Sequence, residues 1–102
     1  MSDHFNKLSP AEAERLALLS EEMGECQHVI GKILRHGYNS TNPVKKDGVT
    51  NRELLDQELG DVQYAVSLMV HCGDVRRGKI QAGRNKKALT VWRYLHHQSR
   101  LP

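Results

Sequence analysis

The chain has 102 residues, 38% of them hydrophobic, with a single Trp and a single Phe. This length allows one small domain, whose core must consist mostly of Leu, Ile, Val, Ala and Met. The formal net charge is +3, but all 12 acidic residues precede residue 75, whereas residues 75–102 hold eight Lys and Arg. Cys26 and Cys72 fit no CxxC pattern, and no apolar run approaches about 18 residues. We therefore expect no disulfide framework, no membrane partner and a cytoplasmic location.

The first predicted element is a long helix that begins after Ser9. Pro10 suits the first helical position, and Ser9 with Glu12 forms a capping box. Apolar residues then recur at spacings of three and four, typical of an amphipathic helix: Leu16, Leu19, Met23, Cys26, Ile30 and Ile33. Gly37 suits the position after a helix, so the helix should end near His36.

Residues 37–49 are rich in Gly, Asn, Ser, Pro and Asp, which predicts a loop long enough to be functional. Thr50 and Glu53 form a second capping box, followed by a helix to about residues 71–73. Residues 74–83 are predicted as a short helical turn or linker, and residues 84–98 as a last helix. The fold class is all-α: a long helical hairpin with a shorter C-terminal helix, flanked by an N-terminal arm (1–8) and a basic C-terminal segment (74–102).

Acidic residues crowd one face of each long predicted helix. Residues 21–25 read EEMGE, where Glu22 and Glu25 are three apart, and Glu58 and Asp61 share that spacing. Like charges at this spacing repel by about 0.2–0.5 kcal/mol. Two neighbouring helices can bring both pairs around one point, where Mg²⁺, which prefers oxygen ligands, would remove the repulsion. The pairs lie beside the apolar seam, which favours a metal site over an ordinary solvated face.

The EExxE of residues 21–25, followed by the ExxD of residues 58–61, resembles the signature of the MazG-like all-α nucleoside triphosphate pyrophosphohydrolases. RLALLSEEMGECQHVIGKILRHGYNS and ELLDQELGDVQYAV are similar to small single-domain members carried by bacteriophages, and the resemblance covers roughly residues 9–70. It implies hydrolysis of a (d)NTP to (d)NMP and diphosphate by water attack at the α-phosphorus, in the host cytoplasm if the chain is phage-encoded. It favours a purine such as (d)GTP.

The resemblance also implies which residues form the site. Two or three Mg²⁺ ions, with Mn²⁺ as a substitute, would be held by four ligands: Glu22, Glu25, Glu58 and Asp61. Glu21 matches the first Glu of the motif and would either orient a ligand or accept a proton from water. The candidates for substrate binding are Lys32, which shares a helix face with Glu25, and a group at the start of the predicted last helix: Arg84, Asn85 and Lys86.

Base recognition stays open among aromatic and amide side chains: Tyr38, Tyr64, Trp92, Asn39 and Asn42. A single hairpin would leave much of its apolar seam uncovered. We therefore expect a homo-oligomer, either a dimer or a tetramer, in which two hairpins complete a four-helix bundle.

Two other functions are open to this sequence. Glu25 and His28 form an ExxH, the spacing of ferritin-like di-iron bundles, but the second helix has no matching ExxH. Residues 75–102 would alternatively make the chain a small helical module that binds nucleic acid. No helix-turn-helix, zinc finger or RNA-binding motif supports that alternative, so nucleic acid is not the expected partner.

Overall fold

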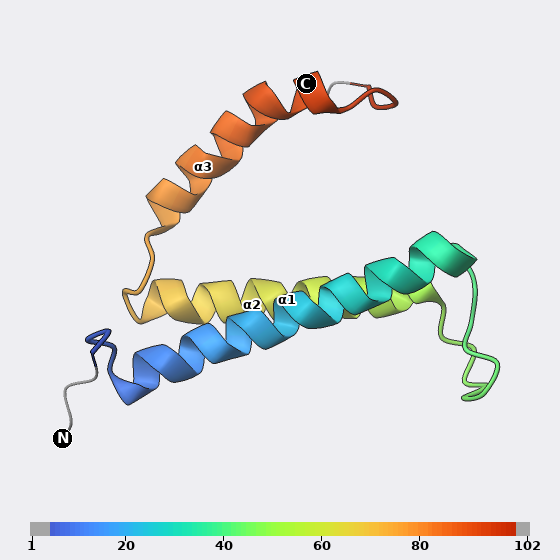
Figure 1. The fold of residues 1–102 in the computed structure, drawn as a ribbon, viewed down its shortest axis with the longest axis horizontal. Helices are drawn as coiled ribbons and strands as arrows, with labels where there is room; N and C mark the ends of the chain where they lie inside the picture. The colour runs from blue at the N-terminus through green and yellow to red at the C-terminus, as the bar shows by residue number, and fades with distance from the viewer. Residues whose placement is uncertain (1–4, 100–102) are drawn as a thin grey trace.

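The computed structural model describes residues 5–99, which contain helices and no strand (Figure 1). The elements are α1 (Pro10–His36), α2 (Asn51–His71), α3 (Arg77–Thr90) and a short 3₁₀ helix, η1 (Val91–Tyr94). α1 and α2 lie side by side as an antiparallel hairpin, and α3 extends away from it (Figure 1). The all-α prediction is thus confirmed. Residues 1–4 of the predicted arm and 100–102 of the basic segment lie outside the described residues.

Local signals place both ends of α1 as predicted. The Ser9 hydroxyl accepts a hydrogen bond from the Glu12 amide at 3.1 Å, and the Glu12 carboxylate accepts one from the Ser9 amide at 2.8 Å. At the other end, Gly37 has a φ of 90° and its amide donates to the Ile33 carbonyl at 2.7 Å. A positive φ favours glycine, which explains why the helix stops at His36.

The start of α2 is capped by Thr50, whose hydroxyl oxygen accepts from the Glu53 amide at 3.2 Å. The Glu53 carboxylate accepts from the Thr50 hydroxyl at 3.2 Å and not from the backbone amide, so the second capping box forms only in part. α2 ends at His71, within the predicted range.

The predicted bounds of the last helix are wrong. α3 begins at Arg77 and ends at Thr90, so residues 77–83 of the predicted short helical turn or linker are the first half of α3, and residues 95–98 are not helical. Gly78 and Gly83 lie inside α3. A glycine costs a helix about 1 kcal/mol but does not break it, and the neighbouring Lys, Arg, Gln and Ala residues are good helix formers.

The core within residues 5–99 is thin. Its buried apolar side chains are those of Cys26 and Val29 from α1 and of Ala65 and Met69 from α2. The predicted α1 seam divides in two: Leu19, Cys26 and Ile33 are buried or half-buried, whereas Leu16, Met23 and Ile30 are exposed. One partner helix covers only one side of a stripe this wide, so the second half stays uncovered.

No helix in the described part of the chain combines the length and the apolar character that crossing a bilayer would need.

Candidate metal centre

Three carboxylates converge between the two long helices. Glu22 of α1 meets Glu58 and Asp61 of α2, with one oxygen of each within 4.8 Å of the others. Glu58 is set by its position on the α1-facing side of α2, where buried or half-buried residues recur at spacings of three and four. Glu22 occupies the matching position on α1, four residues before the buried Cys26. The hairpin therefore holds two half-buried carboxylates in its own seam.

The surroundings of this acidic triad (Glu22, Glu58 and Asp61) disfavour negative charge. Burial raises the pKa of Glu22 above its ordinary value of 4.5, and the charges of Asp61 and Glu58 raise it further. Burial likewise raises the pKa of Glu58, with Asp61 and Glu25 adding to the effect. Partial desolvation and like charges thus act in the same direction on both groups.

No Lys or Arg among residues 5–99 forms an ion pair with the triad. The one ion pair in that range joins Arg15 to Asp74 through two hydrogen bonds of 2.5 and 2.9 Å, and it ties the start of α1 to the segment after α2. The hydrogen bond from Arg15 lowers the pKa of Asp74. The protein therefore neutralises an acid at one end of the hairpin and leaves the triad without a cation.

A hard divalent cation fits this donor set. All three groups are carboxylates, the oxygen ligands that Mg²⁺ and Mn²⁺ prefer, and they come from two helices whose packing fixes their approach. A dication would offset the repulsion that raises the pKa values of Glu22 and Glu58. The nearby Cys26 thiol suits such a site poorly as a ligand, because burial and the carboxylates raise its pKa and keep it protonated.

Two other predicted acidic residues lie outside this close group. Glu25 and Glu21 are exposed on α1. Their charges still act on the triad, since Glu25 raises the pKa values of Glu22 and Glu58, and Glu21 raises that of Glu22. The structure thus brings together three of the four predicted metal ligands, with the fourth at the edge of the cluster.

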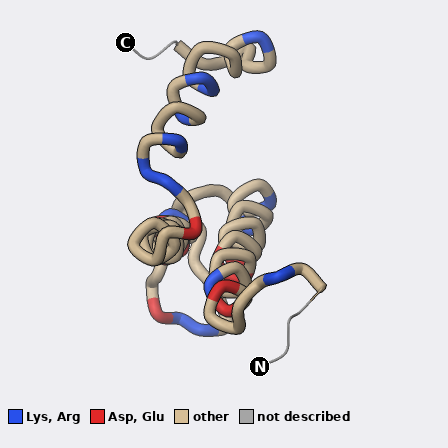
Figure 2. Tube along the Cα trace, turned by 90° about the vertical axis from the view of Figure 1, so that its left-hand side faces the viewer, with Lys and Arg blue, Asp and Glu red and all other residues tan. Residues whose placement is uncertain are grey.

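The predicted substrate-binding residues are divided between two places. Lys32 lies on α1, where it lines a cavity at the loop end of the hairpin. Arg84, Asn85 and Lys86 lie in the middle of α3 and not at a helix start, which corrects the prediction of a helix N-terminus beside the phosphates. α3 carries Lys and Arg but no acidic residue, and it projects from the hairpin in both views (Figures 1 and 2). Within one chain these three residues do not join the triad.

Two structural contacts could not be predicted from the sequence. Asn51 is buried at the start of α2, and its side-chain amide donates to the Gly37 carbonyl at 3.1 Å. Arg15 and Asp74 are 59 residues apart. Both contacts form because the hairpin brings distant segments together, so no local sequence pattern predicts them.

Comparisons with protein-family models, with curated proteins and with solved structures found no match to this chain.

Proposed function

We propose that this chain is a metal-dependent nucleoside triphosphate pyrophosphohydrolase that converts a (d)NTP and water to a (d)NMP and diphosphate. The observation that carries the proposal is the convergence of Glu22, Glu58 and Asp61 on one point of the hairpin, where they form no ion pair with any Lys or Arg of residues 5–99. The resemblance of EExxE and ExxD to the MazG-like signature supports the same reaction and favours a purine such as (d)GTP.

The proposed roles follow from position and charge. Glu22, Glu58 and Asp61 would hold the metal, and Glu25 would join them by a change of side-chain rotamer. Bound Mg²⁺ would screen the triphosphate from these carboxylates and lower the pKa of a water molecule. Glu21, exposed one turn before Glu25, is placed to orient that residue or to receive the proton of the attacking water.

Hydrogen-bond donors for the phosphate chain, most of them positively charged, would come from two sources. Lys32 lies about 10 Å along α1 from Glu25, since a helix rises 1.5 Å per residue. Arg84, Asn85 and Lys86 of α3 would reach the triad only from a second copy of the chain, which is the reason we propose a homo-oligomeric enzyme. Leaving-group charge on diphosphate is stabilised by such donors.

The test is a panel of ribo- and deoxyribonucleoside triphosphates with Mg²⁺ or Mn²⁺, read for diphosphate against single-phosphate release. We expect diphosphate, and we expect Glu58→Gln to reduce the rate by at least about 100-fold while the protein stays helical by circular dichroism. Gln63→Glu, on an exposed position of α2 away from the triad, is the matched control and should retain activity. Intact triphosphates under all conditions would refute the proposal.

The basic surface of α3 supports a second candidate function, nucleic-acid binding. Its cationic residues are exposed and form no ion pair with any described residue: Arg77, Lys79, Arg84, Lys86 and Lys87. This function predicts salt-sensitive binding to DNA or RNA that survives Glu58→Gln. Such binding without any diphosphate release would favour this candidate over the enzyme.

A further inference from the structure

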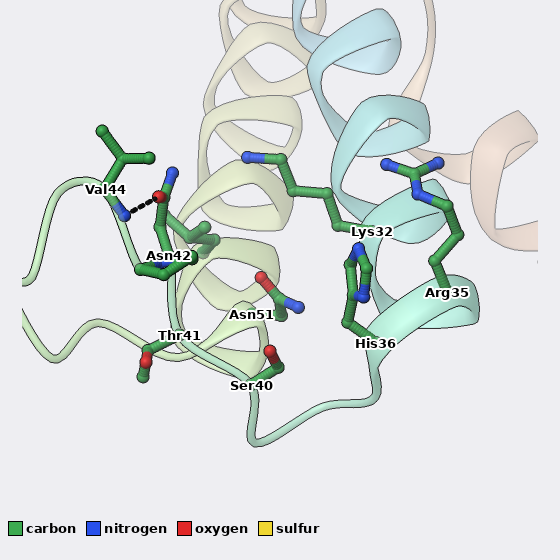
Figure 3. Close-up of a pocket in the computed structure, with 10 residues that line it drawn as sticks. Lys32, Arg35, His36, Ser40, Thr41, Asn42, Val44 and Asn51 are labelled. Atoms are coloured by element: carbon green, nitrogen blue, oxygen red, sulfur yellow. Dashed lines mark hydrogen bonds between the residues drawn. The ribbon is translucent and has the colours of Figure 1, made fainter.

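A cavity of about 450 Å³ opens at the loop end of the hairpin (Figure 3). The last turns of α1, loop residues 40–44, and Asn51 and Leu54 of α2 line it. Its volume lies in the range of about 300–1,000 Å³ that is usual for small-molecule sites. It lies outside the triad, and its loop wall comes from the predicted long loop.

The loop wall is held by hydrogen bonds and does not depend on a ligand for its shape. The Asn42 side-chain oxygen accepts from the amides of Val44 and Lys45, at 2.8 and 3.3 Å. The amide of Asn51 donates to the Ser40 carbonyl at 2.9 Å, and Thr41 pairs with Thr50 as an isolated β-bridge. A site formed in advance loses less conformational entropy when it binds.

These bonds also determine which polar groups remain for a ligand. Because the Asn42 oxygen is used within the loop, its Nδ2 amino group is left as a donor. Asn51 shows the reverse, since its Nδ2 donates to Gly37 and its Oδ1 is left as an acceptor. Figure 3 shows Lys32 extending from α1 toward the Asn42 side of the cavity. Leu54 and Val44 add apolar surface to the lining of the cavity.

The cavity therefore offers an amide donor, an amide acceptor, apolar walls and two cationic side chains, Lys32 and Arg35. Neither Lys32 nor Arg35 forms an ion pair within residues 5–99, so both charges are available to an anion. A planar ring whose edge carries a donor beside an acceptor, linked to an anionic group, matches this set. A nucleoside phosphate has that chemistry.

The cavity lies at a fixed distance from the triad along both helices. Lys32 follows Glu22 by ten residues, which is about 15 Å along α1, and Asn51 precedes Glu58 by seven residues, which is about 10 Å along α2. We infer that this cavity holds the base and sugar of the nucleotide whose phosphates lie at the triad, and that loop 40–44 selects the base. The choice of ligand rests on the proposed function.

Amide chemical-shift mapping of the full chain in EDTA tests the inference without turnover. The probes are dGMP, dAMP, dCMP and dTMP, each titrated to about 10 mM, which detects affinities weaker than millimolar. We expect the largest shifts at His36, at residues 40–44 and at Asn51, and they should differ between bases. No shift from any probe, or shifts confined to α3, would overturn the inference.

A variant of the loop wall provides the kinetic test. Val44 is 86% exposed, so Val44→Asp should leave the fold intact while placing a negative charge beside the incoming nucleotide. We expect KM for the preferred triphosphate to rise about tenfold with kcat changed by less than about twofold. Gln63→Glu adds the same charge elsewhere and should leave KM unchanged.

The two proposals fail in different ways. Diphosphate release with unchanged KM in Val44→Asp and no loop shifts would leave the enzyme proposal standing and refute the nucleoside cavity. Base-dependent shifts at residues 40–44 without diphosphate release from any triphosphate would support the cavity and refute the enzyme.

Discussion

At the scale of single residues, ionising Glu22 and Glu58 costs free energy in the folded protein. Each has a pKa above its ordinary value of 4.5, primarily because burial disfavours its charged form. Between 4.5 and these raised values the folded protein binds more protons than the unfolded chain. The free energy of unfolding therefore falls as the pH rises through this window.

We predict that in EDTA the thermal unfolding midpoint falls as the pH is raised from 4.5 through the raised pKa values of Glu22 and Glu58, and that Mg²⁺ raises the midpoint more above this window than within it. Asp74 does not mask this trend, because its pKa is lowered and its stabilisation is lost only in acid, below its ordinary value of 3.8. Differential scanning calorimetry across pH provides the measurement.

Glu58→Gln is the control, since it removes one charge from the triad without changing its shape. The variant should lose the part of the pH slope that Glu58 contributes, while Glu22 keeps the part that its burial causes, and it should lose most of the stabilisation by Mg²⁺. An unchanged slope in this variant would place the pH effect elsewhere in the molecule.

The acidic triad could be predicted from the sequence only as a set of candidates. The two acidic pairs have the same spacing but contribute differently. Glu58 and Asp61 both belong to the close group, whereas of the other pair Glu22 does and Glu25 does not. A spacing of three restricts both side chains to one sector of the helix, but the offset between two helices and the side-chain rotamers decide which of them meet.

At the scale of elements, the ends of α1 and the start of α2 were predictable because their signals are local. Ser9, Glu12, Thr50 and Glu53 act within a single turn. The bounds of α3 were not predictable, because Gly78 and Gly83 indicate a break between elements, although the surrounding residues keep the chain helical. The pocket loop was predicted as a loop, but its shape depends on Asn51, whose partners are distant in sequence.

Glycine substitutions at two elements should have opposite effects. Gly37→Ala should lower the free energy of unfolding by about 1–3 kcal/mol, because its φ of 90° strains any residue with a Cβ atom. Gly83 lies inside α3 with open space around the position. Gly83→Ala should therefore stabilise the helical conformation of α3 by up to about 1 kcal/mol. Urea unfolding followed by circular dichroism measures the first, and amide hydrogen exchange in α3 measures the second. If both substitutions stabilised the protein, or both destabilised it equally, the positive φ of Gly37 would not be the cause of the expected loss of stability.

At the scale of the whole molecule, the chain is less compact than a globular domain of the same length. Its radius of gyration is 17.6 Å, whereas a compact chain of this size has about 13 Å. The difference comes from α3, which extends away from the hairpin (Figure 1). Basic and apolar side chains of α3 are therefore exposed to solvent. The hairpin adds an apolar flank of its own, formed by Leu16, Met23 and Ile30 on α1, each 43–51% exposed.

The flank residues recur at every seventh position. Because seven residues make about two helical turns, they lie in one row along α1, and such a row packs against another helix. A second hairpin would supply such a helix and, through its own α3, positive charge for the acidic triad. We predict a dimer or a larger assembly by sedimentation velocity at micromolar concentration. Leu16→Lys with Ile30→Lys should give a monomer that has lost most diphosphate release, whereas Gln63→Lys adds charge away from the flank and should change neither property. A wild-type monomer with full activity would show instead that one hairpin completes the site alone and that α3 has no part in it.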